Sequence, residues 1–183
     1  MKPEDHIFSI GHGNKTIDEL ISELKSFEIQ FLVDIRSVPY SRINSQFNRE
    51  RLKFILKEKG ISYGYMGDVL GGLPKDSSCY TDGKVDYNKL KEKAFFRKGL
   101  ERLRDANDQS LQVCLMCSEM NPKECHRTKL IGVELQKIKI ELQHIIGVSK
   151  KKSQSQVIAE LTHGNGLITL FGEEHFVSRK KYL

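Results

Sequence analysis

A strand–helix–strand pattern near the start of the chain constrains the fold more than any other feature of the sequence. Apolar runs at residues 7–10 and 31–35 each predict a buried strand. Between them, Thr16 and Glu19 have the spacing of a helix-capping pair, and apolar side chains recur at helical spacing up to Phe27. A unit of this length is typical of parallel strands joined by a right-handed crossover.

The rest of the chain continues this alternation up to residue 147. The pattern predicts a helix at 48–59, an edge strand at 61–65, a long loop at 67–86, a helix at 87–107, a buried strand at 111–116, a helix after Arg127 and a strand at 141–146. We therefore expect an α/β protein with a three-layer, Rossmann-like fold and a mostly parallel central sheet.

The last part of the chain has a weaker pattern. Lys150, Lys151, Lys152 and Ser153 suggest a solvated linker, followed by a small helix, a strand at residues 167–171 and a basic tail. We expect residues 1–147 to form the α/β core domain. Residues 148–183 would then be a C-terminal extension that packs on this domain or trails from it.

Composition narrows the class of protein. No stretch has the length of a transmembrane helix and the start lacks a signal-peptide pattern, so we expect a cytoplasmic protein with no membrane partner. The four cysteines are too few for a disulfide scaffold, which leaves free thiols, metal ligands or a catalytic thiol. A net charge of +6 favours a nucleic acid or a phosphorylated small molecule as partner, although spare surface lysines would give the same balance.

Three polar motifs directly follow predicted strands. They begin at Gly11, Asp34 and Cys117. Because ligands bind at the carboxyl edge of an open parallel sheet, these motifs should converge on one site.

The segment from Cys117 to Arg127 offers the most chemistry. A thiol at a helix start, beside His126 and Arg127, can act as a nucleophile, and Arg127 can bind phosphate. Small buried core cysteines are the alternative, which we favour for Cys114. A zinc site is disfavoured because Cys114 and Cys117 would point to opposite faces of a strand, so we expect neither metal nor cofactor.

The other motifs supply candidate binding groups. Asp34 and Arg36 form either a buried ion pair or a site in which Arg36 and Arg42 hold an anion and Asp34 orients them or acts as a base. The remaining candidates for substrate binding are loop residues that follow a strand or lie in a glycine-rich turn: Gly11, His12, Asn14, Ser37 and Gly71.

Taken in order, these motifs resemble a known family. The series comprises residues 10–14, 33–42, 47–48, 70–72 and 117–127, and it is similar to the prokaryotic family called domain of unknown function 488. The resemblance implies a compact Rossmann-like α/β domain with the motif residues as its site, and it implies no particular reaction. Gly13 stands where the family often has Ser, and Ile35 where Val is commoner. The strand order and Cys117 at a strand end also resemble, more distantly, the rhodanese-like sulfurtransferases.

Three functions follow as hypotheses. The first is an enzyme, of hydrolase or glycosidase type, acting on a phosphate-bearing substrate such as a nucleotide or a nucleic-acid base. Its acid–base candidates are Asp34, Glu119 and His126, and its anion holders are Arg36, Arg42 and Arg127. The second is rhodanese-like thiol or sulfur-transfer chemistry at Cys117 or Cys125. The third is a non-catalytic nucleic-acid-binding module that uses the basic surface.

Overall fold

The computed structural model describes residues 6–169, 172–173 and 175–183. The helices are α1 (Ile17–Lys25), α2 (Arg49–Glu58), α3 (Gly67–Leu70), α4 (Tyr87–Lys91), α5 (Ala94–Asp108), α6 (Val133–Lys137) and α7 (Gln154–Leu161). The strands are β1 (Ile7–Gly11), β2 (Phe31–Asp34), β3 (Ser62–Tyr65), β4 (Tyr80–Thr81), β5 (Lys84–Val85), β6 (Val113–Cys117), β7 (Gln143–Gly147), β8 (Lys150–Ser153), β9 (Ile168–Thr169) and β10 (Gly172–Glu173). Short 3₁₀ turns at Ser45–Phe47, Ser77–Cys79 and Pro122–Glu124 and a π-helical segment at Arg127–Gly132 complete the described elements.

A six-stranded sheet in the order β3-β2-β6-β1-β7-β8 forms the centre of the molecule. The first five strands of this order run parallel, and β8 pairs antiparallel with β7. The predicted α/β fold with a mostly parallel sheet is therefore confirmed. β1 and β2 are parallel but not adjacent, because β6 inserts between them and pairs with both.

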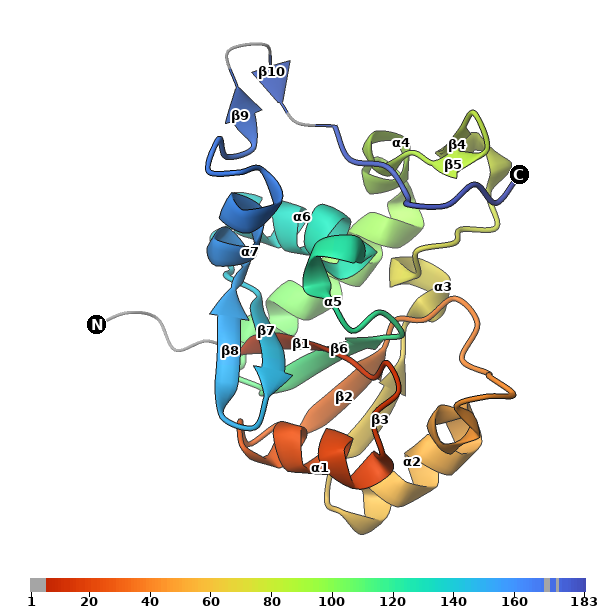
Figure 1. Ribbon diagram of the computed structural model, residues 1–183, viewed down its shortest axis with the longest axis vertical. Helices are drawn as coiled ribbons and strands as arrows, with labels where there is room; N and C mark the ends of the chain where they lie inside the picture. Colours follow the sequence, from red (N-terminus) through yellow and green to blue (C-terminus); the bar gives the residue numbers. More distant parts are fainter. Residues whose placement is uncertain (1–5, 170–171, 174) are drawn as a thin grey trace.

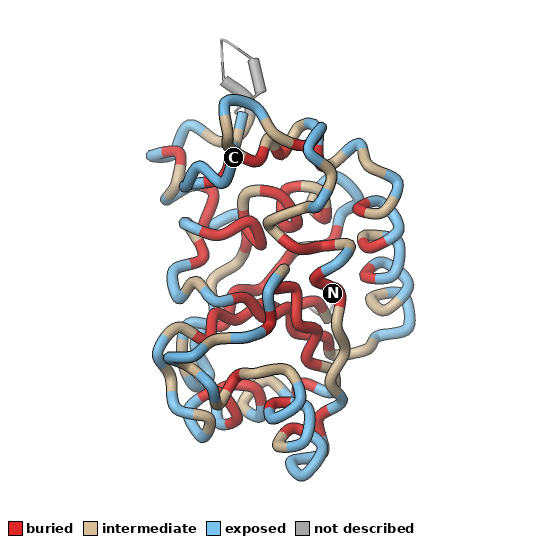
Figure 2. Tube along the Cα trace, turned by 90° about the vertical axis from the view of Figure 1, so that its right-hand side faces the viewer, coloured by how far each residue is buried: buried red, intermediate tan, exposed pale blue. Residues whose placement is uncertain are grey.

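Helices cover both faces of the sheet, which gives the predicted three layers (Figure 1). Strand residues alternate between two apolar clusters because successive side chains point to opposite faces. On one face Phe8 and Ile10 pack with residues of α1 and α2, and on the other Leu115 packs with residues of α3, α5 and α6. Figure 2 shows the buried residues concentrated in the centre of the molecule, between the exposed outer segments.

The predicted start of α1 is confirmed in detail. The Thr16 hydroxyl accepts a hydrogen bond from the Glu19 N–H at 3.2 Å, and the Glu19 carboxylate accepts one from the Thr16 N–H at 2.6 Å. These reciprocal bonds satisfy N–H groups that the first turn of a helix cannot pair internally.

The expected linker at residues 150–153 is wrong. Lys150–Ser153 forms strand β8, whose backbone continues the sheet through its ladder with β7. Lysines suit such an edge strand because their charges prevent pairing with another chain. Ser153 then caps α7, with its side chain accepting from the Gln156 N–H.

Other predicted elements differ in extent. The helix expected at residues 87–107 is two helices, α4 and α5, since Lys93 adopts an extended conformation between them. The expected loop at 67–86 contains α3 and the β4–β5 hairpin. Of the strand expected at 167–171, residues 168–169 form β9, while Leu170 and Phe171 lie outside the described residues. Within the described chain, none of the helices combines the length and the apolar character needed to cross a membrane.

Candidate functional site

A cavity of about 250 Å³ lies beyond the carboxyl ends of β2 and β6. Parallel strands of an open sheet bring their following loops together at this edge, as the sequence predicted. The lining residues come from the loops after β2 and β6, the turn after α3, helix α4, residues 124–126 and the end of the chain. They are Arg36, Ser37, Val38, Gly72, Leu73, Tyr87, Cys117, Ser118, Glu119, Glu124, Cys125, His126, Ser178, Arg179, Lys180 and Tyr182.

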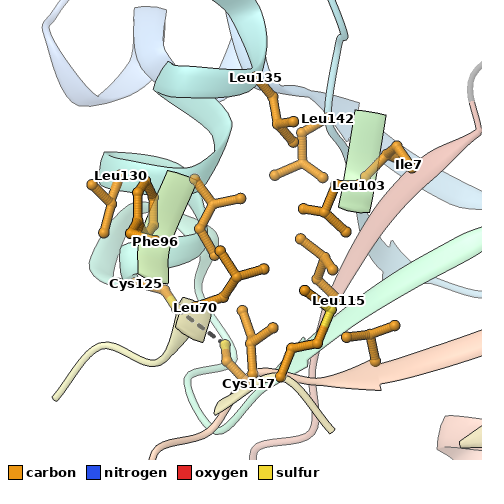
Figure 3. Packing of buried hydrophobic residues seen from close by; sticks show 14 of the residues in the cluster. Ile7, Leu70, Phe96, Leu103, Leu115, Cys117, Cys125, Leu130, Leu135 and Leu142 are labelled. Atoms are coloured by element: carbon orange, nitrogen blue, oxygen red, sulfur yellow. Dashed lines mark hydrogen bonds between the residues drawn. The ribbon is translucent and has the colours of Figure 1, made fainter. Parts of the chain in front are cut away.

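Two cysteine thiols meet at this cavity. Cys117 is the last residue of β6, and Cys125 follows the 3₁₀ turn Pro122–Glu124. Their Sγ atoms lie 3.1 Å apart, and both residues are free thiols (Figure 3). Each is only 1% exposed, so solvent reaches the pair through the cavity that both residues line.

Arg127 lies behind the thiols and is fully buried. Its Nη1 donates to the Cys117 Sγ and, at 2.7 Å, to the Glu119 carbonyl, while Nη2 donates to the Met120 carbonyl at 2.9 Å. Among the described residues, no carboxylate forms an ion pair with it. A buried guanidinium is costly without a compensating negative charge. Here the Cys117 sulfur and two backbone carbonyl oxygens accept its hydrogen bonds.

The two thiols differ in their surroundings. Burial raises the pKa of Cys117 well above its ordinary value, and Cys125 adds to this rise while Arg127 opposes it. Cys125 Sγ accepts the Arg127 backbone N–H at 3.5 Å, at the start of the helical segment that leads into α6. Such N–H groups stabilise a thiolate. This backbone N–H makes Cys125 the candidate nucleophile of the pair.

His126 and Glu119 flank the Cys125 sulfur. The His126 Nδ1 and the Glu119 Oε2 each lie 3.5 Å from Cys125 Sγ. Burial lowers the pKa of His126, so its ring is neutral at neutral pH and can accept a proton. Burial alone would raise the pKa of Glu119, but hydrogen bonds from its own backbone N–H and from the Cys125 and Cys117 thiols help to bring it below its ordinary value. Glu119 is therefore ionised at neutral pH.

Asp34 and Arg36 form the buried ion pair that was one of the two interpretations of their motif. The Arg36 Nε and Nη2 donate to the two oxygens of Asp34 at 2.8 and 2.6 Å. Arg36 also donates to the Phe47 carbonyl at 2.7 Å and contacts the His12 ring, and the Tyr63 hydroxyl donates to Asp34 at 2.8 Å. These contacts use most of the Arg36 N–H donors. Arg36 lines the cavity, whereas Asp34 is fully buried and does not.

Of the other predicted binding residues, some lie at the cavity and some do not. Ser37 lines the cavity, and its hydroxyl accepts from the Leu73 N–H at 2.9 Å. Gly71 is buried next to Ser37. A Cβ atom added at Gly71 would lie 2.4 Å from Ser37 Oγ. Asn14 and Arg42 are exposed, and neither lines the cavity.

Sequence reasoning missed the contribution of the end of the chain. Ser178, Arg179, Lys180 and Tyr182 line the cavity, but the sequence suggested only a basic tail. The signal that could have found them is the run of cations at residues 179–181. Nothing local in the sequence indicates that this run returns to the strand ends.

A metal site was not expected, and the predicted reason is seen in the structure: Cys114 and Cys117 belong to apolar clusters on opposite faces of the sheet. A different set, Cys117, Glu119 and Cys125, has potential ligand atoms within 4.8 Å of one another. The Arg127 guanidinium touches the Cys117 sulfur, and its positive charge opposes a bound cation there.

The fold and the site define an α/β protein with a cysteine-containing cavity at the carboxyl edge of its sheet. The chain belongs to the family described as domain of unknown function DUF488, which matches residues 16–133. This match confirms the resemblance drawn from the motifs, and it contains every cavity residue from Arg36 to His126. No curated protein and no solved structure matches the chain.

Proposed function

We propose that this protein is a thiol-dependent enzyme that takes a sulfur atom from a small anionic donor, with Cys125 as the nucleophile. The observation that carries the proposal is the pair of thiols, with sulfur atoms 3.1 Å apart, at a cavity that also presents Arg36, Arg179 and Lys180. Positive groups attract an anionic donor, and the paired thiols provide both a nucleophile and a second reacting sulfur.

The first step forms a persulfide. The neutral His126 ring takes the proton from Cys125, and the resulting thiolate attacks the outer sulfur of a donor such as thiosulfate. The sulfur–sulfur bond of thiosulfate breaks, sulfite leaves with the bonding electron pair, and the transferred sulfur remains on Cys125. The Arg127 N–H that points at Cys125 Sγ stabilises the thiolate.

Cys117 can then release the transferred sulfur. The Cys117 sulfur attacks Cys125 Sγ and forms a disulfide with it, the bond between Cys125 Sγ and the outer sulfur breaks, and the outer sulfur takes up the Cys117 proton and leaves as hydrogen sulfide. The sulfur atoms must approach by about 1 Å to reach the length of a disulfide bond. An external dithiol then reduces the disulfide and regenerates both thiols.

The test is site-resolved mass spectrometry after incubation of the reduced protein with thiosulfate. We expect one added sulfur on Cys125 in the Cys117→Ser variant, where the persulfide cannot be resolved. Cys125→Ser should carry no added sulfur, and Cys114→Ser, a buried cysteine on the other face of the sheet, should behave as the wild type. The absence of added sulfur on Cys125 in the Cys117→Ser variant would contradict the proposal.

A second candidate is hydrolysis of a phosphate-bearing substrate, such as a nucleotide or a nucleic-acid base. The observation that favours it is Glu119, an ionised carboxylate in a cavity lined by cations. Glu119 would activate water as a general base, while the ion-paired Asp34 would position Arg36. Hydrolysis of nucleoside phosphates that is lost in Glu119→Gln and retained in Cys125→Ser would replace the thiol proposal with this one.

A further inference from the structure

Residues 178–182 return from the end of the chain to the cavity, and all of them except Lys181 line it. In Figure 1 this segment runs past α4 and the β4–β5 hairpin, far in sequence from β2 and β6. It also lies outside residues 16–133, the part of the chain that the family shares. Whatever it adds to the site therefore comes from outside the matched region.

Backbone hydrogen bonds hold this segment in place. Ser178 is 4% exposed, its N–H donates to the Val85 carbonyl at 3.0 Å, and its hydroxyl accepts from the Val85 N–H and donates to the Lys180 carbonyl. The Tyr182 N–H donates to the Gly83 carbonyl at 2.7 Å. Gly83 has a φ of +79°, and a Cβ there would lie 2.2 Å from the Leu183 carbonyl oxygen. The segment is thus anchored on both sides of Arg179 and Lys180.

The anchored segment presents two cations at the cavity. Arg179 pairs with Glu124 at 2.5 Å, and both side chains line the cavity about half exposed. The Lys180 carbonyl accepts from the Ser178 hydroxyl, but no hydrogen-bond or ion-pair partner of its ammonium group is found among the described residues. Arg36, in contrast, has most of its donors occupied by Asp34, Phe47 and His12. Lys180 therefore supplies an unpaired positive charge to the cavity, and Arg179 supplies a second one that it shares with the half-exposed Glu124.

We propose that Arg179 and Lys180 form the anion-recognition element of the site and select negatively charged reagents for reaction at Cys125. The identity of the natural reagent as a sulfur donor rests on the proposed function, but the selection of anions does not. Arg179 and Lys180 bind the oxyanion end of the molecule, and its other end approaches the thiol pair.

The experiment compares alkylation of Cys125 by iodoacetate, an anion, with alkylation by iodoacetamide, its neutral analogue. The rate constant for iodoacetate divided by that for iodoacetamide reports the effect of the reagent's charge, because the reactivity of the thiol contributes to both rate constants. We expect Arg179→Gln and Lys180→Gln each to lower this ratio roughly threefold to tenfold, the effect of one nearby charge in a partly solvated site. Glu124→Gln, which frees Arg179 from its ion pair, should raise the ratio.

Lys181→Gln is the matched control, because it removes the same charge from the same segment at a residue that does not line the cavity. Its ratio should remain close to that of the wild type. An equal fall in Lys181→Gln, or a fall in the iodoacetamide rate together with the iodoacetate rate in Arg179→Gln and Lys180→Gln, would overturn the inference. If thiosulfate leaves no persulfide on Cys125 but the ratios change as expected, the sulfur-transfer function fails and the anion-recognition element stands.

Discussion

His144 shows how a buried side chain makes the stability of the fold depend on pH. This fully buried residue belongs to β7; its Nδ1 lies 2.7 Å from the Ser9 hydroxyl and its Nε2 lies 2.8 Å from Gln154 Oε1. Burial lowers the pKa of His144 from 6.5 to about 3. The folded protein therefore keeps this ring neutral over a pH range in which the unfolded chain protonates it.

The free energy of unfolding should consequently fall as the pH drops below about 6.5. Since the unfolded state binds the extra proton, His144 alone should remove about 2 kcal/mol of stability between pH 7 and pH 5. Urea unfolding of His144→Gln should give a flatter pH dependence over this range, whatever its stability at pH 7. The exposed His163 provides the control variant, His163→Gln. A pH dependence that is unchanged in His144→Gln would show that other groups cause it.

At the scale of elements, the site depends on a close contact between the loops after β1 and β6. The His12 N–H donates to the Cys117 carbonyl and the Gly13 N–H to the Ser118 carbonyl, both at 3.0 Å. A Cβ on Gly11 would lie 1.9 Å from the Glu119 carbonyl oxygen, the same atom that accepts from Arg127. Only glycine allows this approach.

Gly11→Ala should therefore displace the loop that carries Glu119 and loosen Arg127. We expect a loss of stability of about 1–3 kcal/mol, as for other overpacked buried sites, together with slower alkylation of Cys125. Gly64→Ala is the matched control, since its added Cβ would meet only a Val33 methyl group at 3.8 Å. Equal effects of the two substitutions on the alkylation rate would argue against the loop contact as the cause.

The order of elements was predictable because local patterns determine it. The Thr16–Glu19 capping box and the alternating strand residues at 7–10 and 113–116 carry their own signals. The lysine-rich strand β8 carries none, because its pairing with β7 depends on backbone hydrogen bonds that any residue can make. The same applies to the position of β6 between β1 and β2.

At the scale of the whole molecule, the site was predictable only where strand ends define it. Arg36, Cys117 and Glu119 were expected at one edge of the sheet, and they meet there around the cavity. Asn14 and Arg42 belong to the same motifs but are exposed and do not line the cavity. Arg179 and Lys180 could not be placed, because their position depends on hydrogen bonds with residues almost a hundred positions earlier, such as that between Ser178 and Val85.

The most direct test of the thiol centre is competitive alkylation of all four cysteines at neutral pH with a limiting amount of iodoacetamide, read out residue by residue by mass spectrometry. The account predicts that Cys125 reacts first, while Cys79 and Cys114, whose pKa values burial raises, react only after unfolding. Labelling of Cys125 that is no faster than that of Cys114 would contradict the assignment of Cys125 as the nucleophile.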